Sequence, residues 1–287
     1  VDKCQLRCAY HGWAFDRDGW LTDYSHDNFG KSLIKHQLRT FPVEVRYGLI
    51  WLFPGDPAKA EEQAIPVIPE LTGDNPWAGF TVDYTWNTLH SMVIDNICDF
   101  AHAFLHRKYQ PFVDAKLTHY EADDKKVYMT YDTYMAEGRI SRYFVNRKRV
   151  NTRSIEICYD YPYQWSNTGD SIKHYCFLLP IDEKTTRVFF VFCFGSIQLP
   201  VLGLNAPKWL TQIVLNAAVP LLFKPLLAED GVALEAEQLG YDTHWDAAPI
   251  ELNPVVPLLQ KLTAQKWQDY LERASVAPLQ VARQPAG

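Results

Sequence analysis

Four side chains that can bind a metal ion or carry a proton fall within the segment Asp95 to His106. Asp95, Asp99, His102 and His106 are offset by four, three and four residues, which is the repeat of an α-helix. We therefore expect all four on one face of a helix. The other positions are mostly apolar, which favours a buried face over a solvated one. Because unpaired buried carboxylates are unfavourable, a divalent metal ion would supply the missing positive charge.

The two histidines need a third protein ligand from a distant part of the chain. Two histidines and one carboxylate form the facial triad typical of non-haem Fe(II) oxygenases. Asp230 is the candidate carboxylate because it lies at the start of a helical segment rich in apolar residues. Glu229 competes with it for the same role. The alternative for Asp230 is an exposed acid that the helix dipole favours at a helix start.

A cysteine and a histidine near the start of the chain form a second candidate metal site. Cys8 and His11 are separated by two residues, and Gly12 follows them. A thiolate and an imidazole at this spacing can bind one metal ion, and by spacing alone a core cysteine beside an unrelated histidine is equally compatible. His174 has no partner pattern, and we interpret it as a surface or core residue.

The order of expected elements indicates an α+β fold. Residues 1 to 57 are typical of short strands and turns, with a turn at 16–19 and a buried strand at 47–53, and the proline-rich segment 54–76 is expected to connect two domains. A strand at 77–88 precedes the metal-binding segment, and a helix over 206–239 should be broken or kinked at Pro220 and Pro225. A shorter helix is expected at 250–273. The antiparallel meander expected between residues 109 and 193 includes strands at 126–131, 140–145, 153–159, 174–179 and 186–194.

Composition excludes some classes of function. The net charge of -6 over 287 residues provides no basic surface for nucleic acid. Six scattered cysteines in a chain of this size favour a reducing, cytoplasmic location. The apolar stretch 209–228 is interrupted by polar residues, so we expect a buried or pocket-lining helix there rather than a membrane span.

Three motifs together resemble a known family. Cys8-x-x-His11-Gly12-Trp13 precedes Asp95-Asn96-x-x-Asp99-x-x-His102-x-x-x-His106, and Glu229-Asp230-x-x-x-x-Glu235-x-x-Gln238 follows. In this order the motifs resemble those of the oxygenase component, or alpha subunit, of Rieske non-haem iron oxygenases. The resemblance implies a truncated all-β Rieske domain at residues 1–57. It also implies a catalytic domain at 58–287, in which a curved antiparallel sheet surrounds a long helix in a helix-grip, START-like arrangement.

The resemblance also implies roles for individual residues. His102, His106 and Asp230 would bind a mononuclear Fe(II), and Asn96 would lie near it. Asp99 would pass an electron to an iron-bound histidine from a Rieske histidine of a neighbouring subunit. Cys8 and His11 would be two of the four ligands of a [2Fe-2S] cluster. The other half of that motif, Cys-x-His, does not occur in this sequence, so we expect the natural protein to begin earlier.

By the same resemblance, the chain would be an oxidoreductase that uses O₂ to hydroxylate or dihydroxylate an apolar, aromatic or polycyclic substrate, as in aromatic hydrocarbon catabolism. Electrons from NAD(P)H would arrive through a reductase and in some systems a ferredoxin, and the assembly would be a homotrimer. Oxidative demethylation or desaturation at the same iron is an alternative. A second alternative is a non-enzymatic carrier of hydrophobic ligands, because the same fold also occurs in proteins that bind such ligands.

Overall fold

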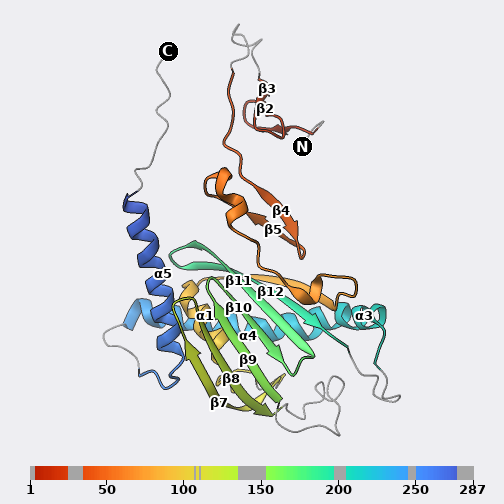
Figure 1. Cartoon of the computed structure of the whole chain (residues 1–287), viewed down its shortest axis with the longest axis vertical. Helices are drawn as coiled ribbons and strands as arrows, with labels where there is room; N and C mark the ends of the chain where they lie inside the picture. Colours follow the sequence, from red (N-terminus) through yellow and green to blue (C-terminus); the bar gives the residue numbers. More distant parts are fainter. Residues whose placement is uncertain are drawn as a thin grey trace. The chain divides into compact units, whose positions relative to one another are not determined.

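The computed structural model describes residues 4–24, 35–106, 108–109, 111–134, 153–196, 205–244 and 250–276. The chain divides into two compact units, Val1–Val67 and Ile68–Gly287 (Figure 1). The point of division lies inside the proline-rich segment 54–76, which carries little regular structure apart from two short 3₁₀ helices, η2 (Pro57–Glu62) and η3 (Pro69–Leu71).

The first unit is built from short antiparallel strands. Its three-stranded sheet has the order β1-β2-β3, and a separate hairpin pairs β4 with β5. At the expected turn 16–19, Gly19 has a φ of +83° and the Asp16 carboxylate accepts the backbone N–H groups of Asp18 and Trp20, which confirms that prediction. The bounds are β1 Leu6–Arg7, β2 Ala14–Phe15, β3 Leu21–Asp23, β4 Val43–Arg46 and β5 Leu49–Leu52.

The strand expected at 47–53 is present as β5, but the expectation that it is buried is wrong for this chain. Ile50 is 77% exposed. A two-stranded hairpin has too little apolar surface to enclose either face, so side chains of both faces remain accessible.

The second unit is organised by a seven-stranded antiparallel sheet of order β6-β12-β11-β10-β9-β8-β7. Side chains alternate between its two faces, and on β8 Val127, Met129 and Tyr131 point inward and are fully buried. The strand expected at 140–145 lies outside the described residues. The bounds are β6 Ala78–Trp86, β7 Val113–Ala122, β8 Lys126–Tyr134, β9 Arg153–Asp160, β10 Tyr163–Thr168, β11 Ile172–Asp182 and β12 Thr185–Phe194.

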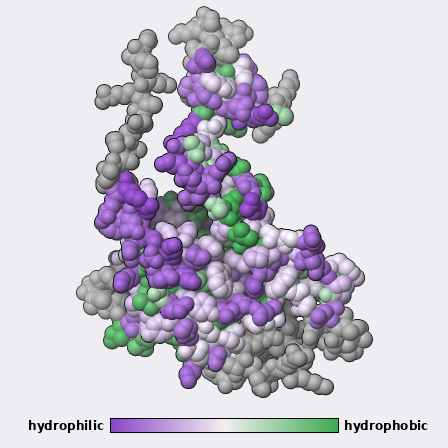
Figure 2. Space-filling view, viewed as in Figure 1, coloured by the Kyte–Doolittle hydropathy of each residue, from purple (hydrophilic) through white to green (hydrophobic). Residues whose placement is uncertain are grey.

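Helices cover the inner face of this sheet. Figure 1 shows α1 (His90–Cys98) and α4 (Lys224–His244) behind the strands, with α5 (Val256–Val276) at the β7 side. Apolar residues of these three helices and of the inner face form one core cluster. Figure 2 shows that the outward face of the sheet and the exposed side of α5 carry many hydrophilic residues. The expected curved sheet around a long helix is therefore confirmed.

The long helix passes its prolines without breaking. α3 (Lys208–Ala218) continues through the π-helical turn η5 (Val219–Phe223) into α4. Pro220 lies in the first turn of η5, where the wider turn accommodates the missing N–H, and Pro225 lies in the first turn of α4. The local irregularity expected at Pro220 is confirmed, but a break there is not.

The first half of this helix is less buried than expected. Lys208–Thr243 is long and apolar enough to cross a membrane by length and composition, although a core helix of a soluble protein can pass the same test. Only 17% of its most apolar window is buried, and Trp209 and Leu221 are among the exposed side chains. The prediction that the helix at 209–228 is buried is therefore wrong for most of these positions, and its pocket-lining alternative stays a prediction.

Candidate metal centre

The helix that carries the first part of the site ends earlier than predicted. α1 stops at Cys98, and Asp99 at its C-terminal end has extended backbone angles. The Asp99 carboxylate accepts the backbone N–H of Ala101 at 2.8 Å, a local bond that competes with continuation of the helix. The prediction of one helix from Asp95 through His106 is therefore wrong.

The two histidines lie instead on the turns that follow α1. The Leu105 N–H donates to the His102 carbonyl at 2.9 Å, and the Tyr109 N–H donates to the His106 carbonyl at 3.1 Å. These turns bring the two imidazole rings to a centroid separation of 5.3 Å. The predicted convergence of His102 and His106 is thus present, although turns produce it rather than a helix face.

Asp230, from the middle of the long helix, completes the cluster. One nitrogen or oxygen atom of each of His102, His106 and Asp230 lies within 4.8 Å of the others. The Asp230 Oδ1 is 3.3 Å from the His106 Nε2 and 3.7 Å from the His102 Nε2. His106 and Asp230 are only 3% and 7% exposed. Two imidazoles and one carboxylate aimed at a common point are the donor set of a facial triad.

The buried carboxylate is consistent with a cation at that point. The Asp230 Oδ1 is inaccessible to solvent, and the Nε2 atoms of His102 and His106 lie within 4 Å of it. A buried carboxylate oxygen is unfavourable without a compensating positive charge, and the two ring nitrogens that face it can themselves act as metal ligands. The residues therefore fit a divalent metal ion.

Glu229 contacts the same histidine from the other side. Its Oε2 is 3.0 Å from the His106 Nδ1, whereas Asp230 faces the Nε2. Burial alone would lower the pKa of His106, but the hydrogen bonds and charges of Asp230 and Glu229 outweigh burial and raise it. Of the two acids, the Asp230 carboxylate belongs to the three-residue cluster, whereas Glu229 lies on the opposite side of the His106 ring.

His102 is held in its neutral form by its surroundings. Burial lowers the pKa of His102, and the charge of Asp230 only partly opposes this effect. A hydrogen bond between the ring and the Asp99 backbone helps to orient it. The rings of Phe100 and Phe112 lie 6.2 and 5.7 Å from the His102 ring, so its immediate neighbours include two apolar side chains. A neutral imidazole in an apolar setting is ready to bind a metal.

Asp95 does not join the cluster, which corrects the expectation that four groups share one face. Its Oδ2 accepts a hydrogen bond from the Gln260 Nε2 of α5 at 2.8 Å. Its Oδ1 is buried without a partner in the described part of the chain, and burial raises the pKa of Asp95 to about 7. Asn96 lies on α1 two residues before its end and is partly buried.

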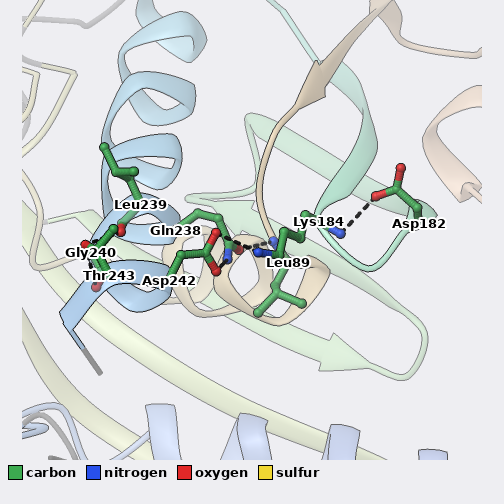
Figure 3. A network of polar contacts seen from close by, with 8 residues as sticks. All are labelled: Leu89, Asp182, Lys184, Gln238, Leu239, Gly240, Asp242 and Thr243. Atoms are coloured by element: carbon green, nitrogen blue, oxygen red, sulfur yellow. Dashed lines mark hydrogen bonds and ion pairs between the residues drawn. The ribbon is translucent and has the colours of Figure 1, made fainter. Parts of the chain in front are cut away.

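Side chains of α4 fix the chain segment that enters α1. Glu235 accepts hydrogen bonds from the Asn87 backbone and side chain at 2.9 and 3.0 Å. The Gln238 Oε1 accepts the Leu89 N–H, and its amide donates to Asp242, which pairs with Lys184 (Figure 3). Leu89 has no side-chain oxygen to cap α1, and the contact from Gln238 on the distant helix α4 satisfies the N–H of Leu89 itself.

A glycine beside Asp230 sets the distance between α4 and β6. A Cβ atom at Gly231 would overlap the indole of Trp86. The absence of a side chain lets the helix approach the strand closely, with Asp230 on its inner side. The motif 229–238 pointed to these residues, but the supporting roles of Gly231, Glu235 and Gln238 depend on partners about 145 residues earlier, which no local pattern reveals.

In the first unit, Cys8 and His11 lie on one tight turn. The Gly12 N–H donates to the Cys8 carbonyl at 3.0 Å, and Gly12 has a φ of +74°. Backbone N–H groups of Tyr10 and His11 hydrogen-bond to the Cys8 sulfur and lower the pKa of its thiol. Both residues are exposed within this unit. A thiolate supported by backbone amides next to an imidazole fits an iron–sulfur ligand pair.

Sequence comparison finds one relative that matches nearly the whole chain and another that matches about a third of it. A family model for the vanillate O-demethylase oxygenase C-terminal domain matches residues 86–273. The 4β-methylsterol monooxygenase of Methylococcus capsulatus is 42% identical over 284 residues, which cover 97% of this chain and 77% of that enzyme. The oxygenase component of dicamba O-demethylase from Stenotrophomonas maltophilia is 35% identical over 112 residues, 36% of this chain and 30% of that protein.

Solved structures with a similar fold are more distant in sequence. Dicamba monooxygenase bound to 3,6-dichlorosalicylic acid has a TM-score of 0.68 and 19% identity, with 94% of this chain and 81% of that chain covered. Pseudomonas putida CBB5 NdmA with caffeine has a TM-score of 0.59 and 22% identity, with 94% and 73% covered. At these identities the likeness shows that the fold is shared.

Proposed function

Since this chain belongs to the Rieske-type oxygenases, a family of enzymes that use non-haem iron and a Rieske cluster, we propose that it is a monooxygenase component acting on a methyl group of an apolar, polycyclic substrate. The observation that carries the proposal is the buried convergence of His102, His106 and Asp230 in a chain 42% identical to a 4β-methylsterol monooxygenase. A methylsterol is accordingly the first substrate class to test.

We propose that His102, His106 and Asp230 hold the mononuclear iron and that Cys8 and His11 supply two ligands of the [2Fe-2S] cluster. Iron bound there would supply O₂ activation, driven by electrons from the cluster. The overall reaction consumes O₂, two electrons and two protons, and converts a methyl C–H bond to C–OH with release of water.

The remaining side chains would prepare the site. Glu229 would fix the ring of His106, so that its Nε2 would face a bound metal. Asp99 starts the turn that carries His102 and would relay an electron to it from a neighbouring subunit, and Asn96 lies one helical turn earlier. Phe100 and Phe112 lie beside His102, where their apolar rings would exclude water and favour an apolar substrate.

Oxidation of a methyl group also accounts for the demethylation alternative. Hydroxylation of a methoxyl carbon gives a hemiacetal that loses formaldehyde, so an O-demethylase and a methyl hydroxylase share the same oxidation step. The family match to a vanillate O-demethylase domain favours this second candidate over cis-dihydroxylation. Desaturation is left as an outcome of product analysis.

Oxygenase components of this family work with a reductase and a ferredoxin. For this chain we propose NAD(P)H as the electron source, a homotrimeric assembly and a cytoplasmic location.

The test combines reconstituted turnover with product analysis. The protein, reductase and ferredoxin are supplied with NAD(P)H and either a 4-methylsterol or a methoxybenzoate, and O₂ consumption and products are measured. We expect substrate-dependent O₂ consumption and a hydroxymethyl product from the sterol. Exclusive turnover of the methoxybenzoate would replace this assignment with O-demethylation. A cis-diol product, or no turnover by protein loaded with iron and cluster, would contradict both.

A further inference from the structure

The first half of the long helix has an apolar face that remains accessible in the described structure. Trp209, Ile213, Ala217 and Leu221 recur every four residues along α3 and η5, and all four are exposed. Leu215, on the opposite side of the helix, is fully buried. Residues four apart lie on one side of a helix, so these four side chains form a single apolar row.

The opposite side of the helix is attached to the sheet. The Gln212 side-chain amide donates to the Gly79 carbonyl on β6 at 2.9 Å and accepts the Gly79 N–H at 3.2 Å. The Tyr84 hydroxyl of the same strand donates to the Lys224 carbonyl at 2.8 Å. Since this helix continues to Asp230, moving it away from the sheet would also displace a residue of the three-residue cluster. The helix can therefore meet a membrane with its exposed face but cannot cross one.

The charged side chains beside the apolar row are all positive. Residues 205–228 contain Lys208 and Lys224 and no acidic residue, although the whole chain has 34 acids among 287 residues and a net charge of -6. Both lysines are exposed, and one lies at each end of the row. Helices that lie in the headgroup region of a membrane combine an apolar face and a tryptophan with lysines that reach the lipid phosphates.

A membrane surface matches these charges better than a second copy of the chain does. Two copies that met through the same face would bring their lysines together without an acid to pair with them, and like charges oppose such a contact. Anionic lipid headgroups supply the missing negative charge, and the acyl chains beneath them accept apolar side chains.

We propose that this face docks on the surface of an anionic lipid bilayer, with the helix lying along the surface. Its apolar side chains enter the boundary between headgroups and acyl chains, and its two ammonium groups contact lipid phosphates. The inference goes beyond the proposed function and does not depend on its substrate, although a bilayer is also where an apolar, polycyclic substrate dissolves. The docking face consists of Lys208, Trp209, Ile213, Ala217, Leu221 and Lys224.

The first experiment measures binding to vesicles of two compositions. The unmodified protein is sedimented at low salt with vesicles of phosphatidylcholine and phosphatidylglycerol, and with vesicles of phosphatidylcholine alone. We expect about ten-fold tighter binding to the anionic vesicles, because two lysines lie at the membrane surface. The double variant Lys208→Gln/Lys224→Gln should lose most of this preference. No binding to either kind of vesicle would overturn the proposal, and equal affinities would overturn the lysine contacts.

The second experiment places a negative charge in the apolar row. Trp209→Glu should weaken binding to anionic vesicles by about ten-fold or more, since it removes a large apolar side chain and repels the headgroups. The matched control is Trp267→Glu in α5, on the other side of the second unit (Figure 1), because Trp267 is 58% exposed and Trp209 is 64% exposed. The control should bind within about two-fold of the unmodified protein, as its side chain lies outside the docking face.

Unchanged binding by Trp209→Glu, or an equal loss in both tryptophan variants, would overturn the proposal. If Trp209→Glu does not fold, Leu221→Glu makes the same test at another exposed position of the row. Sedimentation velocity without lipid distinguishes a membrane from a second copy of the chain. Trp209→Glu should keep the oligomeric state of the unmodified protein. Dissociation in Trp209→Glu but not in Trp267→Glu would show an interface between copies and would contradict membrane docking.

Discussion

Glu229 and Asp230 are adjacent acids that contact different nitrogen atoms of His106. Asp230 faces the His106 Nε2 within the three-residue cluster, and Glu229 lies against the Nδ1. A metal ligand must have its lone pair toward the ion, so a carboxylate on the opposite nitrogen fixes the productive tautomer. Substitution of Asp230 and substitution of Glu229 should therefore have different effects on iron binding.

The first prediction separates these two roles. Asp230→Ala should lose stoichiometric iron binding because one of three ligands is gone, whereas Glu229→Gln should bind iron with an affinity lower by about 10- to 100-fold. Iron content after titration with Fe(II) and desalting measures the difference. The control is Glu237→Gln, because Glu237 is an exposed acid on the same helix. This variant should bind as much iron as the unmodified protein. Full iron in Asp230→Ala together with its loss in Glu229→Gln would reverse the assignment.

Asp95 yields a prediction about stability and pH. Burial raises its pKa to about 7, above the value of about 4 in an unfolded chain. Between these values the folded state binds the proton more strongly, so the contribution of Asp95 to stability is largest below pH 4 and falls as the pH rises toward 7. Asp95→Asn should remove this dependence. Relative to the unmodified protein, it should gain about 1–3 kcal/mol in the free energy of unfolding between pH 5 and pH 8.

Denaturant unfolding at the two pH values tests this prediction. The readout is the difference between variant and unmodified protein, so other titrating groups cancel. A difference that does not change between pH 5 and pH 8 would mean that Asp95 ionises in the folded protein much as it does in water.

At the scale of elements, α4 positions the metal ligand by close approach to β6. Gly231 lies against the indole of Trp86, whereas a Cβ at Gly240, nine residues later in the same helix, would meet no atom within 4 Å. The helix thus contains a glycine that its packing requires and one that it does not.

The third prediction compares alanine at these two positions. Gly240→Ala should stabilise the protein by about 0.5–1 kcal/mol because alanine is the better helix former. Gly231→Ala should destabilise it by about 1–3 kcal/mol through overpacking and should weaken iron binding as α4 moves away with Asp230. Thermal unfolding and iron titration of both variants measure the effects. Equal stability of the two variants would show that α4 can shift without cost.

These elements also show what could be predicted from sequence. The helical periodicity of residues 95, 99, 102 and 106 predicted the convergence of His102 and His106, but it wrongly included Asp95 and predicted a continuous helix. The Asp99 side chain forms a local bond where α1 ends. The alternating pattern at 77–88 predicted β6 correctly because one face is buried and the other is not. β10 was not predicted, as its inward positions carry Gln164 and Ser166, polar residues that hide the apolar alternation.

For the whole molecule, the pairing of distant parts is the least predictable feature. Placing β12 between β6 and β11 brings segments about 100 residues apart together, and no short-range pattern encodes it. Likewise, Asp230 could be proposed as a ligand from its type and its helix, but only the fold places it beside His106. The resemblance to a family supplied the long-range arrangement that the residues alone left open.

The last prediction concerns the assembly. If Asp99 relays electrons from a cluster in a neighbouring subunit, two different inactive chains should complement each other within one trimer. A Cys8→Ala chain lacks a cluster ligand but keeps the iron ligands, and an Asp230→Ala chain has the reverse defect. In a random equal mixture, one neighbouring pair in four joins an intact cluster to an intact iron site, since each partner is the required chain half of the time. Co-assembled protein loaded with both groups should therefore recover about a quarter of the unmodified activity.

Adding Asp99→Asn to the Cys8→Ala chain should abolish this recovery while both metal contents stay unchanged. Recovery that survives Asp99→Asn would remove Asp99 from the electron path, and the absence of any recovery in a confirmed mixed trimer would confine electron transfer to a single subunit.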